Sequence, residues 1–220
     1  MNVTQPEYSD LVEMAAQDSL EILGAFHPKE EDKAPPSCKT LLLLGPGANF
    51  WETMKSSKEW SDGHKDPIDR WSTRIITTLA NQAGAKAAFP FGGPPYEPFY
   101  TWAMRTGRIW SSPVKLAVHE RLGLFVSFRG ALLFDQLVSL PEPPSESPCE
   151  TCAKPCLTAC PVSALTQDGY EVEACHSFLD TPKGQTCMGQ GCQVRLCCPV
   201  GQELRKPEQS AYHMRLFHKS

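Results

Sequence analysis

Ten cysteines occur among the 220 residues, and nine of them lie between residues 149 and 198. The first four form the run Cys149-Glu-Thr-Cys152-Ala-Lys-Pro-Cys156-Leu-Thr-Ala-Cys160, which Pro161 ends. The other five are Cys175, Cys187, Cys192, Cys197 and Cys198, and proline follows again. Thiolates are ligands for zinc, copper and iron–sulfur clusters. The chain is expected in the cytoplasm, where thiol pools keep cysteines reduced, so disulfides are not predicted.

The first run differs by one residue from the run C-x2-C-x2-C-x3-C-P, whose fourth cysteine binds the neighbouring cluster in two-cluster ferredoxins. The second Cys-Pro indicates that two clusters share ligands reciprocally. We therefore predict a ferredoxin-like module with two 4Fe–4S clusters. The ligands of the first would be Cys149, Cys152, Cys156 and Cys198, and those of the second Cys160, Cys175, Cys187 and Cys192. Cys197 is the alternative to Cys198, because adjacent cysteines rarely serve one cubane together.

Zinc is the alternative metal for this module. Structural zinc sites favour paired C-x2-C knuckles, often with histidine. Cys149 and Cys152 form one such pair, but the x3-C-P ending is not typical of zinc sites. The spacing favours iron–sulfur chemistry, and hence a redox function that depends on an electron donor such as a flavodoxin, a ferredoxin or a reductase. A zinc-stabilised binding module and an electron carrier without a substrate of its own are the two alternatives.

Composition and charge exclude few functions but favour a soluble cytoplasmic protein. The formal net charge of −4 provides no basic footprint for nucleic acid, so nucleic-acid binding is not expected. No window holds the roughly 18–20 uninterrupted apolar residues of a membrane span, so no membrane partner is expected. The first seven residues lack the charged and apolar regions of a signal peptide.

Residues 1–140 show the pattern of an α+β domain. Helices are predicted over residues 9–26, from Asp66 to a stop at Gly84, and over residues 98–106. Strands are predicted at residues 40–44 and 85–91, followed by apolar runs at 114–118, 122–128 and 131–134 that suggest an antiparallel portion. Asp66 is expected to cap its helix, because proline follows it at the first helical position.

The organisation predicted from these patterns has four parts. Residues 1–140 would form a cofactor-binding domain, 141–148 a proline-rich linker, 149–205 the cluster module and 206–220 a C-terminal tail helix. The linker is predicted from four prolines without a hydrophobic pattern, which is typical of an extended segment.

Residues 98–200 resemble the epoxyqueuosine reductases, which are iron–sulfur and cobalamin enzymes of tRNA maturation. Cys160-Pro-Val-Ser-Ala-Leu is similar to that family's C-P-T-x-A-I motif, Cys175-His-Ser-Phe-Leu to its C-I-S-Y-L motif, and residues 123–133 to its G-S-x-x-x-L-G-x-L-L strand pair. Residues 66–69 and 119–133 also resemble cytosolic cobalamin-processing proteins. Both resemblances imply a nitroreductase-like core that binds cobalamin in the N-terminal domain, and flavin is the alternative cofactor for such a core.

The resemblance implies roles for few single residues. Trp102 to Ser112 is similar to the family's A-x-x-A-G-L-G-W segment, which places Trp110 and Ser111 at a turn beside the corrin. The family's catalytic aspartate has no counterpart in Pro90 to Glu97, where glycine occupies that position. No catalytic residue is therefore assigned, and the expected substrate is another small molecule or the corrin itself. Glu97 is expected in an exposed loop, and His119 at the surface.

Overall fold

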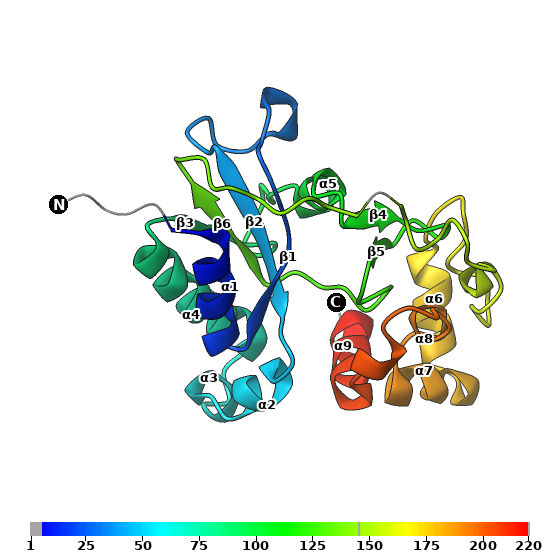
Figure 1. Ribbon diagram of the computed structural model, residues 1–220. Coiled ribbons are helices and arrows are strands. Elements are labelled where there is room, and N and C mark those ends of the chain that lie inside the picture. The colour runs from blue at the N-terminus through cyan, green and yellow to red at the C-terminus, as the bar shows by residue number, and fades with distance from the viewer. Residues whose placement is uncertain (1–5, 145, 220) are drawn as a thin grey trace. The chain divides into compact units, whose positions relative to one another are not determined.

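The computed structural model describes residues 6–144 and 146–219 (Figure 1). Helices and antiparallel strands both contribute, which confirms the α+β class. Contacts divide the described residues into two compact units, an N-terminal unit up to residue 108 together with 127–144, and a cysteine-bearing unit of 109–126 together with residues from 146 onward. No helix of the described part is long and apolar enough to cross a membrane.

The N-terminal unit is built on a four-stranded sheet in the order β1-β2-β6-β3, in which every neighbouring pair is antiparallel. The strands are β1 (Leu20–Phe26), β2 (Thr40–Pro46), β3 (Lys86–Ala88) and β6 (Gly130–Phe134). Strands β2 and β6 are the central pair. Their runs of Leu, Ala and Phe are buried almost throughout, because the sheet is covered where they lie.

Helices α1 (Tyr8–Gln17) and α4 (Pro67–Ala83) pack beside each other on the sheet of the N-terminal unit (Figure 1). Helices α2 (Phe50–Lys55), α3 (Lys58–Ser61) and α5 (Phe99–Arg105) complete this unit. Proline at the first helical position begins α4, and Gly84 ends it in the left-handed conformation, as the sequence predicts. Asp66 makes no side-chain capping bond, so that part of the prediction is wrong.

The helix predicted over residues 9–26 is wrong in its second half. Helix α1 ends at Gln17, Ser19 takes a left-handed φ of 57°, and residues from Leu20 onward form β1 instead. Pairing with β2 overrides the helical spacing of these apolar residues, because the strand buries Leu20, Leu23 and Phe26 against the unit's core. Strand β3 is also shorter than predicted and ends before the Phe89 to Phe91 segment.

The cysteine-bearing unit consists mostly of short elements. It has a two-stranded hairpin of β4 (Ile109–Ser111) and β5 (Ala117–His119), and helices α6 (Val172–Leu179), α7 (Gln185–Gln190), α8 (Gln193–Leu196) and α9 (Pro207–Lys219). This unit also contains three short 3-10 turns, η2 (Pro155–Leu157), η3 (Pro182–Gly184) and η4 (Gln202–Leu204). The 3-10 turn η1 (Glu30–Asp32) lies in the N-terminal unit. Elements this short expose many backbone groups and bury little apolar surface by themselves.

The two units divide the chain differently from the predicted domains. Segment 109–126 packs with the cysteine module, although the sequence assigned it to the domain of residues 1–140. The predicted tail helix corresponds to α9, which also belongs to the cysteine-bearing unit. Residues 1–5, which contributed to the expectation of no signal peptide, residue 145 of the predicted linker and residue 220 of the tail lie outside the described residues.

Candidate metal centres

One hollow of about 280 Å³ in the cysteine-bearing unit, here called the first hollow, is surrounded by four cysteine side chains. These are Cys149, Cys152, Cys156 and Cys198. Cys156 lies in the 3-10 turn η2 and Cys198 follows α8, and each is about 7% exposed. The structure therefore brings together the three clustered cysteines of the first run and one cysteine some forty residues later.

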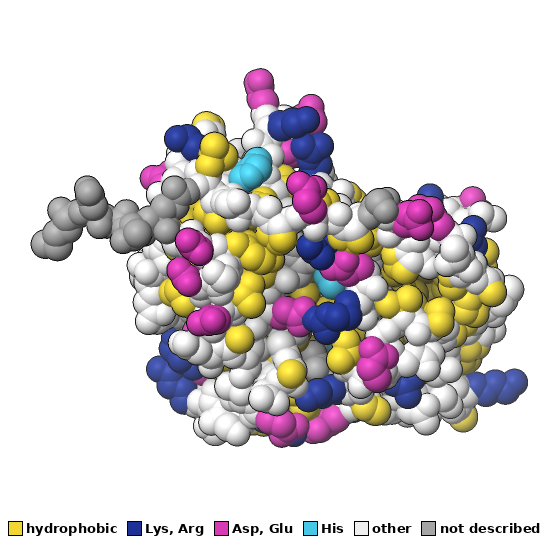
Figure 2. Space-filling view, in the orientation of Figure 1, with side chains coloured by type: hydrophobic (Ala, Val, Ile, Leu, Met, Phe, Trp, Pro, Cys, Tyr) yellow, Lys and Arg dark blue, Asp and Glu magenta, His cyan; other side chains and the backbone are white. Residues whose placement is uncertain are grey.

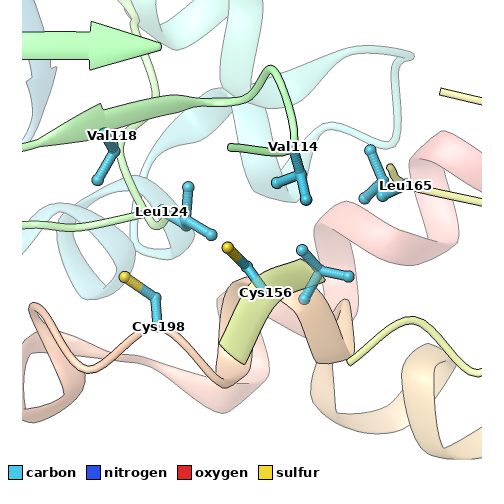
Figure 3. Close-up of a cluster of buried hydrophobic side chains, with 7 residues drawn as sticks. Val114, Val118, Leu124, Cys156, Leu165 and Cys198 are labelled. Atoms are coloured by element: carbon cyan, nitrogen blue, oxygen red, sulfur yellow. The ribbon is translucent and has the colours of Figure 1, made fainter. Parts of the chain in front are cut away.

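The β4–β5 hairpin and the segment that follows it form the wall opposite these cysteines. Figure 3 shows Val118 and Leu124 facing Cys156 and Cys198 within one buried apolar cluster. The backbones approach closely here. A Cβ on Gly123, which has a φ of 56°, would lie 2.3 Å from the Val200 carbonyl oxygen and 2.9 Å from Cys198 Sγ. Arg195 Nη1 donates to the Leu124 carbonyl oxygen at 2.7 Å, which ties the hairpin segment to α8.

A second hollow of about 340 Å³ lies within the same unit and is surrounded by four other cysteines. These are Cys160, Cys175, Cys187 and Cys192. Cys175 lies in α6, Cys187 in α7, and Cys192 precedes the first residue of α8. The short helices of this unit thus serve to bring thiols from four separate places in the sequence to one hollow.

Helix α9 and aromatic side chains close the second hollow. Met214 lines it and is about 6% exposed, in an apolar cluster with Leu179 and Cys187. Tyr170 also lines it and stacks on Phe217 of α9, with ring centroids 5.9 Å apart. The C-terminal helix therefore packs against the second hollow through large apolar groups.

Backbone amides point at the sulfur of one cysteine in each hollow. Lys154 N donates to Cys152 Sγ at 3.3 Å, and Ala164 N donates to Cys160 Sγ at 3.2 Å. Hydrogen bonds of this kind stabilise the thiolate form, which is the form that binds metal. The turns that follow these two cysteines therefore direct backbone N–H groups at sulfur as well as setting the chain direction.

Burial raises the pKa of at least two thiols in each hollow. Desolvation is the largest cause at Cys149 and Cys156 in the first hollow and at Cys175 and Cys187 in the second. A bound cation reverses such a shift, because it holds the thiol deprotonated. Without such a cation, burial holds these thiols in the neutral form.

The remaining two cysteines line neither hollow. Cys197 Sγ donates to the Val194 carbonyl oxygen at 3.2 Å, and burial raises its pKa to about 11. Cys38 Sγ donates to the Thr40 carbonyl oxygen at 3.3 Å, and burial likewise raises its pKa to about 11. The sequence left Cys197 and Cys198 as alternatives, and the structure distinguishes the two. Cys198 lines the first hollow, whereas the Cys197 thiol is hydrogen-bonded to a backbone carbonyl oxygen.

Trp110 and Ser111 lie on β4, in the cysteine-bearing unit. Trp110 packs against the apolar cluster of the first hollow, and Ser111 is exposed. His119 was expected at the surface, and this is wrong. It is about 3% exposed, and its Nδ1 accepts from Arg121 N at 3.1 Å and Leu122 N at 3.2 Å, so it fixes the turn after β5. Glu97 is exposed, as expected.

Several residues of the two hollows were missed at the level of sequence. Tyr170 and Met214 line the second hollow but belong to no motif, and Ser112, at the end of the segment from Trp102 that resembles the family, lines the first hollow but was given no role. Gly123 had a local signal, because it ends a charged turn after His119, where a left-handed residue is common. No local signal identified the others, since their roles depend on tertiary packing.

The described residues contain no group of three or more His, Cys, Asp or Glu side chains that could hold a single metal ion. The thiols instead stand around the two hollows as sets of four. Comparisons of the chain with protein-family models, curated proteins and solved structures gave no match.

Proposed function

We propose that this chain is an iron–sulfur redox protein that holds two 4Fe–4S clusters, one in each hollow. One observation carries the proposal. Each hollow is lined by four cysteines, and the two sets are those that the ferredoxin-type spacing predicts. Cys160 ends the first run but lines the second hollow, and Cys198 ends the second set but lines the first. This is the exchange of ligands that two-cluster ferredoxins use.

The donor set favours clusters over zinc. A zinc ion draws its ligands to one point, with Zn–S distances of about 2.3 Å. A cubane places four thiolates around a larger body, each on a different iron, and a hollow surrounded by four thiols fits that requirement. The second hollow also contains no histidine in its lining, although histidine is common in zinc sites.

Bound in this way, an iron–sulfur cluster supplies one-electron transfer. The chain's own residues would tune it. Lys154 N and Ala164 N offset thiolate charge through hydrogen bonds. Val118, Leu124 and Met214 keep water from the sulfur atoms, since each is buried in a hollow wall. Two clusters in one small folded unit would work as a relay between an external donor, such as a flavodoxin, a ferredoxin or a reductase, and an acceptor.

The acceptor implied by the resemblance is a cobalamin, or a flavin, in a nitroreductase-like N-terminal core. Trp110 and Ser111, which the resemblance places beside the corrin, belong to the cysteine-bearing unit, and Trp110 packs on its apolar cluster. We therefore derive no step through a corrin. A ferredoxin-type role, in which the electrons pass to a partner protein or small molecule, agrees with the two hollows equally well.

The proposal is tested by metal and sulfide analysis of protein purified without oxygen. About eight iron and eight acid-labile sulfide per chain are expected for two cubanes. Zinc without sulfide would overturn the proposal. A separate anaerobic titration with cob(II)alamin tests the acceptor, because a cobalamin-linked reductase must bind it and change its spectrum. An unchanged spectrum together with full iron and sulfide would leave the electron carrier as the function.

A further inference from the structure

The wall of the first hollow contains one buried hydroxyl without a partner. Ser112 lines this hollow and is about 4% exposed. Among the described residues, no group makes a hydrogen bond with its Oγ. A buried polar group left unsatisfied is costly, and native structures contain few of them. The Ser112 hydroxyl is therefore a group that points to a missing acceptor.

The backbone of Ser112 is fixed, so its side chain has little freedom to find a partner elsewhere. Ser112 N donates to the Leu116 carbonyl oxygen at 2.8 Å, and the Ser112 carbonyl oxygen accepts from Lys115 N at 2.9 Å. These two bonds close the turn between β4 and β5. The hairpin thus holds the residue in place at the hollow, next to the exposed Ser111.

The other side chains that line the first hollow leave few acceptors for this hydroxyl. They are apolar, apart from Lys154, whose ammonium only donates, and the four cysteines. The cysteine sulfur atoms are acceptors as well, but none of them makes a hydrogen bond with Ser112 Oγ, so the acceptor must belong to the group that occupies the hollow. Tyr170 likewise brings a hydroxyl-bearing side chain to the lining of the second hollow, beside its four cysteines.

We propose that the Ser112 hydroxyl donates a hydrogen bond to a sulfide of the cluster in the first hollow and thereby raises that cluster's reduction potential. This inference rests on the proposed function. The added electron increases the negative charge on the sulfur atoms, and a donated hydrogen bond stabilises the more negative form. Loss of the hydroxyl should therefore make the first cluster harder to reduce and leave the second unchanged.

The test compares Ser112→Ala with Ser111→Ala, its exposed neighbour on the same hairpin. Both variants are purified without oxygen and titrated with dithionite, with the reduced clusters followed by electron paramagnetic resonance. In Ser112→Ala, one of the two midpoint potentials should become more negative. A tenfold fall in the ratio of reduced to oxidised cluster at a fixed ambient potential corresponds to 59 mV for a one-electron couple. Ser111→Ala should match the wild type in both potentials.

A spectroscopic readout tests the hydrogen bond directly. In wild-type protein exchanged into D2O, electron–nuclear double resonance should show an exchangeable proton coupled to one cluster, and Ser112→Ala should lack that coupling. Equal potentials and an unchanged proton signal in Ser112→Ala, with full iron and sulfide, would overturn this inference alone. Absence of sulfide from the wild type would instead overturn the proposed function.

A conservative variant keeps the test decisive if Ser112→Ala loses iron. Ser112→Thr retains the hydroxyl, so this variant should keep the iron content and the reduction potential of the wild type, unlike Ser112→Ala. A Ser112→Thr protein that holds full iron but shows the lower potential would contradict the inference.

Discussion

The two hollows are each lined by four cysteines but differ in the segment that covers them. The first is covered by residues 109–126, which precede its nearest cysteine by more than twenty residues. The second is covered by α9, which follows the last cysteine. Neither cover lies inside the cysteine run itself. The comparison teaches that the cysteine run alone does not define this unit, because the walls of its two hollows come from both sides of the run.

The covers are also held by different forces. The hairpin cover depends on close backbone approach. Cβ atoms on Gly123 and Gly201 would lie within 3 Å of the backbone of Val200 and of Leu122, respectively. Helix α9 is held by side chains, chiefly Met214 in the apolar cluster and Phe217 against Tyr170 and His176. We therefore expect the first cover to tolerate almost no added atom, whereas the second should respond to lost side-chain volume.

The largest effect is expected from removing one buried cysteine at each hollow. Cys156→Ala should remove the first cluster and Cys187→Ala the second, because each leaves only three thiolates at its hollow. Iron should fall from about eight to about four per chain in each variant, with sulfide in parallel. The reduced single variants should also lose the magnetic interaction between two clusters. A complete loss of iron in either one would show that the hollows do not fill independently.

The adjacent cysteines provide a matched pair for the same measurement. Cys198 lines the first hollow, and Cys197 is bonded to the Val194 carbonyl oxygen. Cys198→Ala should therefore halve the iron content, while Cys197→Ala should keep all of it. The opposite result would mean that the chain exchanges these two ligands when the cluster is built.

Removal of side-chain volume at α9 should affect the second hollow only. Met214→Ala deletes a side chain that is about 6% exposed, and such a change costs about 2–5 kcal/mol of unfolding free energy in a packed core. We expect faster bleaching of one cluster in air, since water and oxygen gain access to the second hollow. Leu216→Ala on the same helix is the control, because that side chain is about 46% exposed. Equal bleaching of both clusters would indicate that α9 stabilises the whole unit instead.

An added methyl group at Gly123 should affect the first hollow only. The left-handed φ of 56° disfavours alanine, and the new Cβ would lie 2.9 Å from Cys198 Sγ. The backbone term alone is about 1–3 kcal/mol. Gly123→Ala should thus lower the thermal midpoint and weaken the cluster that uses Cys198. Gly189→Ala is the control, because a Cβ there meets nothing within 4 Å and its φ is not positive. Loss of the second cluster in Gly123→Ala would contradict the separate roles of the two covers.

The sequence predicted features that depend on neighbouring residues and missed those that depend on distant ones. The ends of α4 followed from Pro67 and Gly84, and the buried strand β2 from its run of leucines. Short gaps bring Cys149, Cys152 and Cys156 together, whereas the exchange of Cys160 and Cys198 between the two sets was predicted from the ferredoxin-type pattern and not from short gaps. Strand β1 was missed because its residues carry a helical pattern, and only pairing with β2 decides their conformation.

The covers of the hollows could not be predicted for the same reason. The packing of Leu124 against Cys156 and Cys198 joins segments separated by more than thirty residues. The sequence of a short hairpin does not indicate which distant segment its apolar side chains will pack against. The assignment of segment 109–126 to the N-terminal domain was therefore natural from the sequence, and the contacts place it in the other unit.

The smallest effect is expected from the ion pair that joins α9 to the end of α6. His218 Nε2 lies 2.8 Å from Asp180 Oδ1, and the Asp180 side chain is about 71% exposed. Solvent screens such a pair, so Asp180→Asn should change the unfolding free energy by less than about 1 kcal/mol. The second cluster should keep its full iron and its rate of bleaching in air. Denaturant unfolding of the anaerobic protein measures the free energy, and loss of cluster absorbance in air measures the bleaching, each beside Met214→Ala. If Asp180→Asn bleaches as fast as Met214→Ala, then the ion pair and not the apolar packing holds the second cover, and the difference between the two covers would have to be restated.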